Sequence, residues 1–352
     1  GHVRDLPEAD LGVDVANDFR PTYEVLPSKV NLVKRLLKAI KDAEAVYVAT
    51  DPDREGEAIA WHLLKIASIP KTKPVYRALF HAITPEAVRE AISHPRALDM
   101  NLVEAQQTRR ILDRLVGYLA SPLAAKSLNG KFSAGRVQSV CLRLVVERER
   151  EIVNFTPEAH WTLALKLSAD GAEFTTNLYR VKNADGMSKT REPLGRLAAL
   201  LPTAQVWVGK TGRTVKARNP LPPFTTSSLQ QAASTGLGLS PDRTMALAQT
   251  LYEQGWITYM RTDGVSVAPE AVSAARAYIT REHGRDYLPS EPPVYTVKTA
   301  NAQEAHEAHE AIRPTDINHL PQVVEGAVAD LYALIWKRFV ASQMSPALYA
   351  VT

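Results

Sequence analysis

Residues 45–63 read AVYVATDPDREGEAIAWHL, and this stretch decides the fold of the region around it. Its first part, 45–50, is a short apolar run rich in β-branched and aromatic side chains, which predicts a buried strand. The apolar spacing over 30–40 predicts a helix before the strand, and 58–67 predicts a helix after it. Helix, strand, acidic loop and helix form an α/β unit, and ligands gather at the carboxyl ends of strands in such units.

The acidic loop carries four carboxylates within residues 51–57. Asp51, Asp53 and Glu55 alternate, and the proline after Asp51 favours an extended backbone, so the three side chains are expected on one face. Acids near a helix start also complement the helix dipole, but this explains only one or two of them. Mg²⁺ is bound by one or two carboxylates together with water and phosphate. The loop therefore predicts a Mg²⁺ site at the three carboxylates, with Arg54 placed to reach a phosphate.

A second informative stretch, 255–264, reads GWITYMRTDG. It follows a predicted helix over 244–254, and a short extended piece at 257–261 would place Tyr259 and Arg261 on the same side. A tyrosine hydroxyl, with a pKa of about 10, becomes a nucleophile when a cation stabilises its phenolate, and an arginine can do this while holding a phosphate. By itself, the stretch favours a half-buried tyrosine beside a surface arginine.

The composition is that of a globular chain of two to four domains, with 352 residues, 45% hydrophobic and 23% charged. A net charge of +4 permits a nucleic-acid partner without requiring one. The single cysteine, Cys141, excludes a disulfide framework and a cysteine-type zinc site. Gly209 to Thr211 ends like a P-loop, but Ala204 stands where that motif requires glycine. We expect no nucleotide hydrolysis, and no membrane span, because no apolar run of about 18 residues occurs.

Basic side chains gather in two further places. A predicted helix over 101–118 carries three arginines that form either a solvated surface or a phosphate-binding rim. Small residues at 133–135 precede another helix and leave backbone amides open to an anion. The arginines concerned are Arg109, Arg110, Arg114 and, in the second place, Arg136.

These stretches resemble the type IA DNA topoisomerases. DPDREGEAIAWHL at 51–63 resembles the acidic signature of their TOPRIM domain. Further similar segments follow in family order: QQTRRILDRLVGY at 106–118, SAGRVQS at 133–139, PLPPFTT at 220–226, the tyrosine stretch at 255–264, and HEAIRPT at 309–315. Together they are specific, and they resemble most closely the bacterial DNA topoisomerase I family.

The resemblance implies an α/β fold combined with mainly-α and β-rich domains of a toroid. Alternating patterns at 161–167, 173–179 and 204–210 agree with a β-rich part. The expected parts are a TOPRIM α/β domain at 1–122, a helical DNA-groove segment at 123–155, a β-rich arch domain at 156–219, a helical domain with the active-site tyrosine at 220–342, and the start of a returning arch segment at 343–352. The family also has an earlier TOPRIM strand with a glutamate and a lysine, and the chain is expected to begin after it.

By the same resemblance, Tyr259 attacks a phosphodiester, forms a 5′-phosphotyrosine and frees a 3′-hydroxyl. Strand passage and religation then relax negatively supercoiled DNA without ATP. Arg261 stabilises the phosphorane, His309 relays a proton or contacts the phosphate, and Asp263 orients Arg261. Mg²⁺ at Asp51, Asp53 and Glu55 holds the 3′ end. The DNA-binding residues implied are Arg54, Arg110, Arg114, Arg136, Gln138, Ser139, Arg313 and Thr315.

The expected partners are single-stranded DNA and negatively supercoiled duplex DNA, for a monomer in the bacterial cytoplasm at the nucleoid, with no zinc in this chain. Two other classes of protein stay open. One is a fragment that binds single-stranded DNA without the chemistry. The other is a different Mg²⁺ phosphotransfer enzyme, such as a primase-like or nuclease TOPRIM protein.

Overall fold

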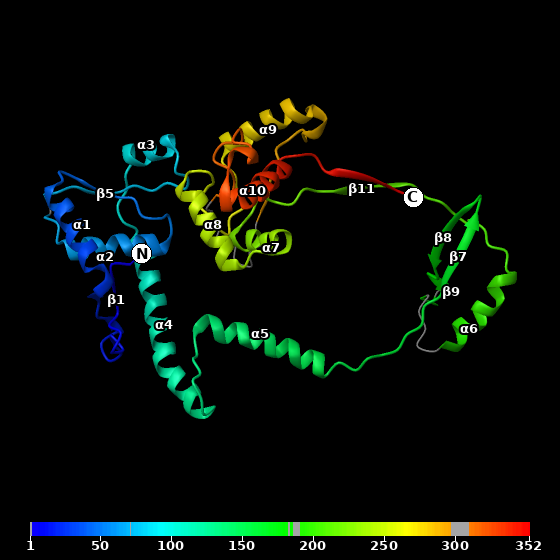
Figure 1. Cartoon of the computed structure of the whole chain (residues 1–352), viewed down its shortest axis with the longest axis horizontal. Helices are drawn as coiled ribbons and strands as arrows, with labels where there is room; N and C mark the ends of the chain where they lie inside the picture. The colour runs from blue at the N-terminus through cyan, green and yellow to red at the C-terminus, as the bar shows by residue number, and fades with distance from the viewer. Residues whose placement is uncertain (1, 71, 182–183, 186–190, 297–309) are drawn as a thin grey trace. The chain divides into compact units, whose positions relative to one another are not determined.

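The structure, a computed structural model, describes residues 2–70, 72–181, 184–185, 191–296 and 310–352 (Figure 1). The chain divides into two compact units. The first unit holds residues 1–133 and 215–351, and the second holds 134–214 and Thr352. The limits of the five parts expected from the sequence stay predictions. Among the described helices, none combines the length and the apolar character needed to cross a membrane.

The first unit opens with short antiparallel strand pairs. Strand β1 (Arg4–Asp5) pairs with β4 (Glu24–Val25), and β2 (Val13–Asp14) pairs with β3 (Arg20–Pro21). A turn of 3-10 helix, η1 (Pro27–Lys29), leads into helix α1. Strand β1 matters for the site, because Asp5 at its end is bonded to Arg110 of helix α4 (Met100–Ser127).

The expected α/β unit is confirmed. Helix α1 (Val30–Asp42) precedes strand β5 (Val46–Val48), which pairs in parallel with β6 (Val75–Arg77). Helix α2 (Arg54–Ala67) forms the crossover between the two strands. Helices α3 (Pro85–Ser93) and α4 (Met100–Ser127) follow, α3 with Thr84 as its N-cap.

One expectation about the acidic loop is wrong. The carboxylates at 51, 53 and 55 do not alternate along an extended segment, because α2 begins at Arg54. Asp53 is the N-cap of this helix, and its Oδ1 accepts a hydrogen bond of 2.8 Å from the amide of Gly56. Glu55 therefore lies in the first helical turn, where it complements the dipole. The loop therefore carries Asp51 and ends at Asp53.

The helices around the tyrosine stretch are confirmed. They are α7 (Thr226–Leu237), α8 (Pro241–Glu253), α9 (Pro269–His283) and α10 (Ala329–Ser342), with the 3-10 turns η3 (Arg285–Tyr287), η5 (Pro321–Val323) and η6 (Gly326–Val328). A capping box at Thr225 and Ser228 starts α7, and Ser240 caps α8. Their apolar faces form one continuous core that also takes in Tyr259.

The second unit is part helix and part hairpin. It contains α5 (Arg136–Val153), α6 (Arg191–Leu200) and the 3-10 turn η2 (Leu201–Thr203). Strand β7 (Ala164–Ala169) pairs antiparallel with β8 (Ala172–Asn177), and β9 (Arg180–Val181) pairs with β10 (Ala184–Asp185). In the first unit, strand β11 (Thr214–Arg218), whose first residue is counted with the second unit, pairs with β12 (Ala347–Val351).

The strand expected at 204–210 is wrong, because these residues are exposed and take no strand conformation. Alternating hydrophobicity predicts a strand only where a partner strand completes its hydrogen bonds. Helix α6 was not expected from the sequence.

Candidate active site

The backbone of the tyrosine segment is held by hydrogen bonds from three sides. The amide of Thr258 donates to the carbonyl of Arg313 over 2.9 Å, and the amide of Tyr259 donates to the carbonyl of His81 over 2.8 Å. On the third side, the hydroxyl of Thr226 donates to the carbonyl of the residue after Tyr259, also over 2.8 Å. Because these partners come from distant parts of the sequence, the position of Tyr259 is set by tertiary structure.

Tyr259 is buried, with only 2% of its surface exposed, and its hydroxyl donates a hydrogen bond of 2.6 Å to Oδ2 of Asp53. Nη1 of Arg261 lies 3.8 Å from the same oxygen, and this arginine side chain is 54% exposed. The ring of Tyr252 packs edge-on against Tyr259, with 5.2 Å between the centroids. Tyr259 and Arg261 thus reach one carboxylate oxygen.

Burial raises the pKa of Tyr259 well above that of an ordinary tyrosine, and the hydrogen bond and charge of Asp53 raise it further. Arg261 acts in the opposite direction and lowers this pKa. The free site therefore holds the tyrosine as a neutral phenol. Burial also raises the pKa of Asp51, and the negative charge of Asp53 adds to this effect.

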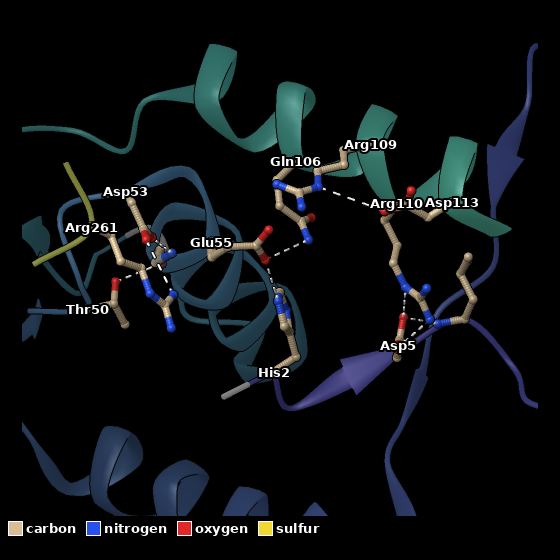
Figure 2. A network of polar contacts seen from close by, with 12 residues as sticks. His2, Asp5, Thr50, Asp53, Glu55, Gln106, Arg109, Arg110, Asp113 and Arg261 are labelled. Carbon is tan, nitrogen blue, oxygen red and sulfur yellow. Dashed lines mark hydrogen bonds and ion pairs between the residues drawn. The ribbon is translucent and has the colours of Figure 1, made fainter. Parts of the chain in front are cut away.

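The three predicted metal ligands do not converge. Figure 2 shows Glu55 turned away from Asp53 toward His2 and Gln106. Its Oε2 lies 3.0 Å from Nε2 of His2 and accepts a hydrogen bond of 3.1 Å from the side-chain amide of Gln106. Within the described ranges, no three metal-ligating side chains are close enough to hold an ion.

Asp51 and Asp53 fit Mg²⁺ as a pair. Both offer hard oxygen ligands, and the repulsion that raises the pKa of Asp51 is one that a cation relieves. Mg²⁺ usually takes one or two carboxylates and completes its shell with water and substrate phosphate, so two carboxylates are enough. The part of Glu55 as a third ligand stays a prediction.

A cavity of about 770 Å³ opens beside these groups. It is lined by side chains from α2, α4, α7 and the tyrosine segment. Its lining residues are Asp53, Arg54, Glu55, Leu102, Arg109, Thr226, Ser227, Gln230, Arg261, Thr262 and Asp263. Three arginines, three carboxylates and several hydroxyl and amide groups face one space, and the arginines and hydroxyls among them are groups that bind a phosphodiester backbone. Arg54 and Asp263 are exposed here, and the contact predicted between Asp263 and Arg261 stays a prediction.

Two of the predicted DNA-binding arginines have protein partners. Arg110 forms a two-bond pair with the carboxylate of Asp5, with both distances at 2.8 Å (Figure 2). Arg114 is buried, and its guanidinium donates to the carbonyls of Leu6, Pro7 and Asp10. These contacts attach the N-terminal segment to α4. A role in DNA binding stays a prediction for both arginines.

Residues 310–315 support the backbone of the tyrosine segment. Arg313 is 7% exposed and donates from Nε to Glu310 over 2.5 Å. The hydroxyl of Thr315 donates to the carbonyl of Gly255 over 2.6 Å. Arg313 also donates from Nη1 to the carbonyl of Pro314, so both side chains bind backbone here. His309 lies outside the described residues, and its predicted role stays a prediction.

The remaining predicted DNA-binding residues lie in the second unit, at the start of α5. Arg136, Gln138 and Ser139 are exposed there. The amide of Gly135, the N-cap residue, donates to the hydroxyl of Ser139 over 3.3 Å. The Gly135 amide is therefore already bonded within the first turn, and a role of these three residues in DNA binding stays a prediction.

Comparison with known proteins identifies the family of this chain. A family model described as DNA topoisomerase matches residues 97–352, and a Toprim domain model matches residues 1–83. The chain belongs to the type IA DNA topoisomerase family. The two matched regions contribute the two halves of the Tyr259–Asp53 pair.

Two relatives in this family cover nearly the whole chain. It is 45% identical to the DNA topoisomerase 1 of Zymomonas mobilis, over 99% of the chain and 29% of that protein. The crystal structure of full-length topoisomerase I from Thermotoga maritima matches with a TM-score of 0.81 and 38% identity, over 99% of this chain and 57% of that one. The chain therefore spans less than a third of the first relative and just over half of the second. The Toprim domain is in general a Mg²⁺-binding fold.

Sequence analysis missed three residues that shape the site: His2 and Gln106, which hold Glu55, and Arg77, which contacts the backbone of the acidic loop. Gln106 belongs to a segment that resembles the family, so a polar contact could have been suspected. Neither His2 nor Arg77 lies in any of the segments that resemble the family.

Proposed function

We propose that this chain carries the strand-cleavage centre of a type IA topoisomerase and acts on single-stranded DNA. The observation that carries the proposal is the pairing of a buried tyrosine hydroxyl with Asp53 at the edge of an arginine-lined cavity. In the complete protein, strand passage between cleavage and religation relaxes negatively supercoiled DNA without ATP. We place this activity in the bacterial cytoplasm, in a monomer.

In the cleavage step, Oη of Tyr259 forms a bond to phosphorus while the bond from phosphorus to the 3′ oxygen breaks. The tyrosine hydroxyl loses one proton and the leaving 3′ oxygen gains one, so the products are a 5′-phosphotyrosine and a 3′-hydroxyl, and religation reverses the step. Asp53 holds the proton of Tyr259 at Oδ2 in the free site. Arg261 is close enough to the same oxygen to favour the phenolate and to carry phosphorane charge.

Arg54 and Arg109 line the same cavity and are placed to bind the phosphates beside the scissile bond. Asp51 and Asp53 are the residues that would hold Mg²⁺, which supplies positive charge beside the 3′ end of the cleaved strand. The hydroxyls of Thr226 and Ser227 at the start of α7 face this cavity as well. They are further hydrogen-bond donors for the DNA backbone.

The test is covalent capture. The chain is incubated with magnesium chloride and single-stranded DNA labelled at its 3′ end, because the 3′ fragment is the one joined to the tyrosine; the mixture is then denatured and separated by electrophoresis. Label that migrates with the protein is expected for the wild type and is expected to be lost in Tyr259→Phe. Tyr252→Phe is the matched control, because it removes the hydroxyl of a buried tyrosine in direct ring contact with Tyr259.

Other results identify the alternatives. Salt-sensitive DNA binding without an adduct would support a chain that only binds single-stranded DNA. A Mg²⁺-dependent reaction on DNA that survives Tyr259→Phe would support a different phosphotransfer enzyme. An adduct that survives Tyr259→Phe but is lost in Tyr252→Phe would identify Tyr252 as the nucleophile and contradict the proposal.

A further inference from the structure

Arg77 is the largest fully buried side chain in the described structure, and nothing in the cleavage reaction uses it directly. It ends strand β6, next to the strand from which the acidic loop emerges. Burying a guanidinium is costly unless its donors are satisfied. Its contacts therefore show what it supports.

All three nitrogen atoms of the Arg77 guanidinium are engaged. Nε donates to Oε1 of Glu57 over 3.0 Å, and this carboxylate is fully buried. Nη1 donates to the carbonyls of Val48 and Ala78, over 3.1 and 2.8 Å. Nη2 donates to the carbonyl of Asp51 over 2.8 Å. One planar group thus connects the end of β5, the first turn of α2 and the backbone of the predicted metal ligand.

The backbone that Arg77 holds is packed tightly. A Cβ at Gly56 would lie 2.0 Å from the carbonyl oxygen of Asp51, so the loop passes over the helix start with no room for a side chain. The hydroxyl of Thr50 also donates to the carbonyl of Gly56 over 2.7 Å. The Asp51 carbonyl therefore lies between the guanidinium and the helix start, and its position fixes the direction of the carboxylates on either side of Pro52.

We propose that Arg77 is a positioning residue for strand cleavage: its guanidinium, with the Thr50 hydroxyl, fixes the loop that carries Asp51 and Asp53 and so orients these carboxylates toward a divalent cation and Tyr259. This inference rests on the proposed function. Lysine cannot replace the fork, because its ammonium donates from a single point. Outer groups that orient metal ligands typically change metal affinity or activity about 10- to 100-fold.

The experiment compares Arg77→Lys with Arg89→Lys, which makes the same change at an exposed arginine on α3. Binding of manganese chloride is measured by calorimetry, and unfolding by urea is followed in parallel. Adduct formation is titrated with Mg²⁺. We expect Arg77→Lys to weaken Mn²⁺ binding and to raise the Mg²⁺ requirement by at least about tenfold. Arg89→Lys is expected to change both quantities less than about twofold, since Arg89 is exposed on α3 and, within the described part of the chain, has no hydrogen bond or ion pair with the loop.

If Arg77→Lys does not fold, two variants of Thr50 provide the test instead. Thr50→Val removes the hydroxyl bond to Gly56, and Thr50→Ser retains it. Weaker Mn²⁺ binding in Thr50→Val with recovery in Thr50→Ser supports the inference, since a purely structural contact would lower stability without changing metal affinity in the folded protein. Wild-type Mn²⁺ affinity in folded Arg77→Lys or in Thr50→Val overturns it, as does a wild type that binds no Mn²⁺. If wild-type protein binds Mn²⁺ and shows these shifts but forms no adduct, the proposed function fails and the inference on the loop stands.

Discussion

The hydroxyl of Tyr259 and the carboxylate of Asp53 are 206 residues apart in the sequence and share a hydrogen bond of 2.6 Å. Asp53 belongs to the Toprim region, and Tyr259 belongs to the region matched by the topoisomerase model. The bond has two consequences. It places the nucleophile at the acidic loop, and it keeps the phenol protonated until the charge around Asp53 changes.

Asp53→Asn is expected to lower the pKa of Tyr259. Burial is the main cause of the raised pKa and remains in the variant, but the hydrogen bond and charge of the Asp53 carboxylate are lost. The pKa therefore falls while staying above that of an exposed tyrosine. The measurement is ultraviolet titration of tyrosinate, taken as the difference between each protein and its Tyr259→Phe counterpart. Identical difference curves with and without Asp53 would show that the carboxylate does not act on the phenol.

The sequence predicted the residues of the acidic loop and the tyrosine segment better than the buried arginines that hold the surrounding backbone. The helix start at Arg54 could have been recognised, because Asp53 is a common N-cap residue and acids favour the first turn. The apolar pattern instead placed the helix start at residue 58, although the acids were also recognised as favourable to a helix dipole. By contrast, the partners of Arg114 lie more than one hundred residues away, and those of Arg77 include carbonyls 26 and 29 residues away. Local patterns carry no signal for a guanidinium that binds distant backbone.

Substitutions of Arg54 and Arg114 are expected to have different effects, the first on DNA binding and the second on stability. Arg54 is exposed at the cavity, so Arg54→Ala should remove one phosphate contact and reduce the salt slope of single-stranded DNA binding by about 0.7. Arg114→Lys should leave that slope unchanged and lower the free energy of unfolding by about 1–3 kcal/mol, because buried carbonyls lose their donors. Fluorescence anisotropy at several salt concentrations and urea unfolding measure the two effects. A changed slope in Arg114→Lys would instead place this arginine on the DNA.

His62 is expected to make the chain sensitive to acid. Burial and then the charge of Arg4 lower the pKa of His62 to about 3, and its Nδ1 accepts a hydrogen bond of 2.6 Å from Arg4. The unfolded chain binds this proton near pH 6.5, whereas the folded chain does not, so stability is present above pH 6.5 and is lost as the pH falls toward 3.

Between pH 7.5 and 5, this histidine should therefore account for a loss of at most about 2 kcal/mol in the free energy of unfolding. His62→Gln cannot take up the proton, and its stability should fall less over the same interval. Urea unfolding of both proteins at the two pH values provides the measurement. Equal losses in the two proteins would mean that the acid sensitivity comes from other groups.

Gly255→Ala is expected to loosen the support of the tyrosine segment. Gly255 has a φ of +78°, and a Cβ there would lie 2.7 Å from the carbonyl oxygen of Ile83. The backbone conformation alone costs about 1–2 kcal/mol for alanine, and the close approach adds to this. Gly236→Ala is the matched control, because it lies in α7 with open space around it, and it should stabilise by about 0.5–1 kcal/mol. Urea unfolding should therefore move in opposite directions in the two variants. If Gly255→Ala matches the wild type, the contact between Gly255 and Ile83 is not maintained in solution, and the tyrosine segment is held by its hydrogen bonds alone.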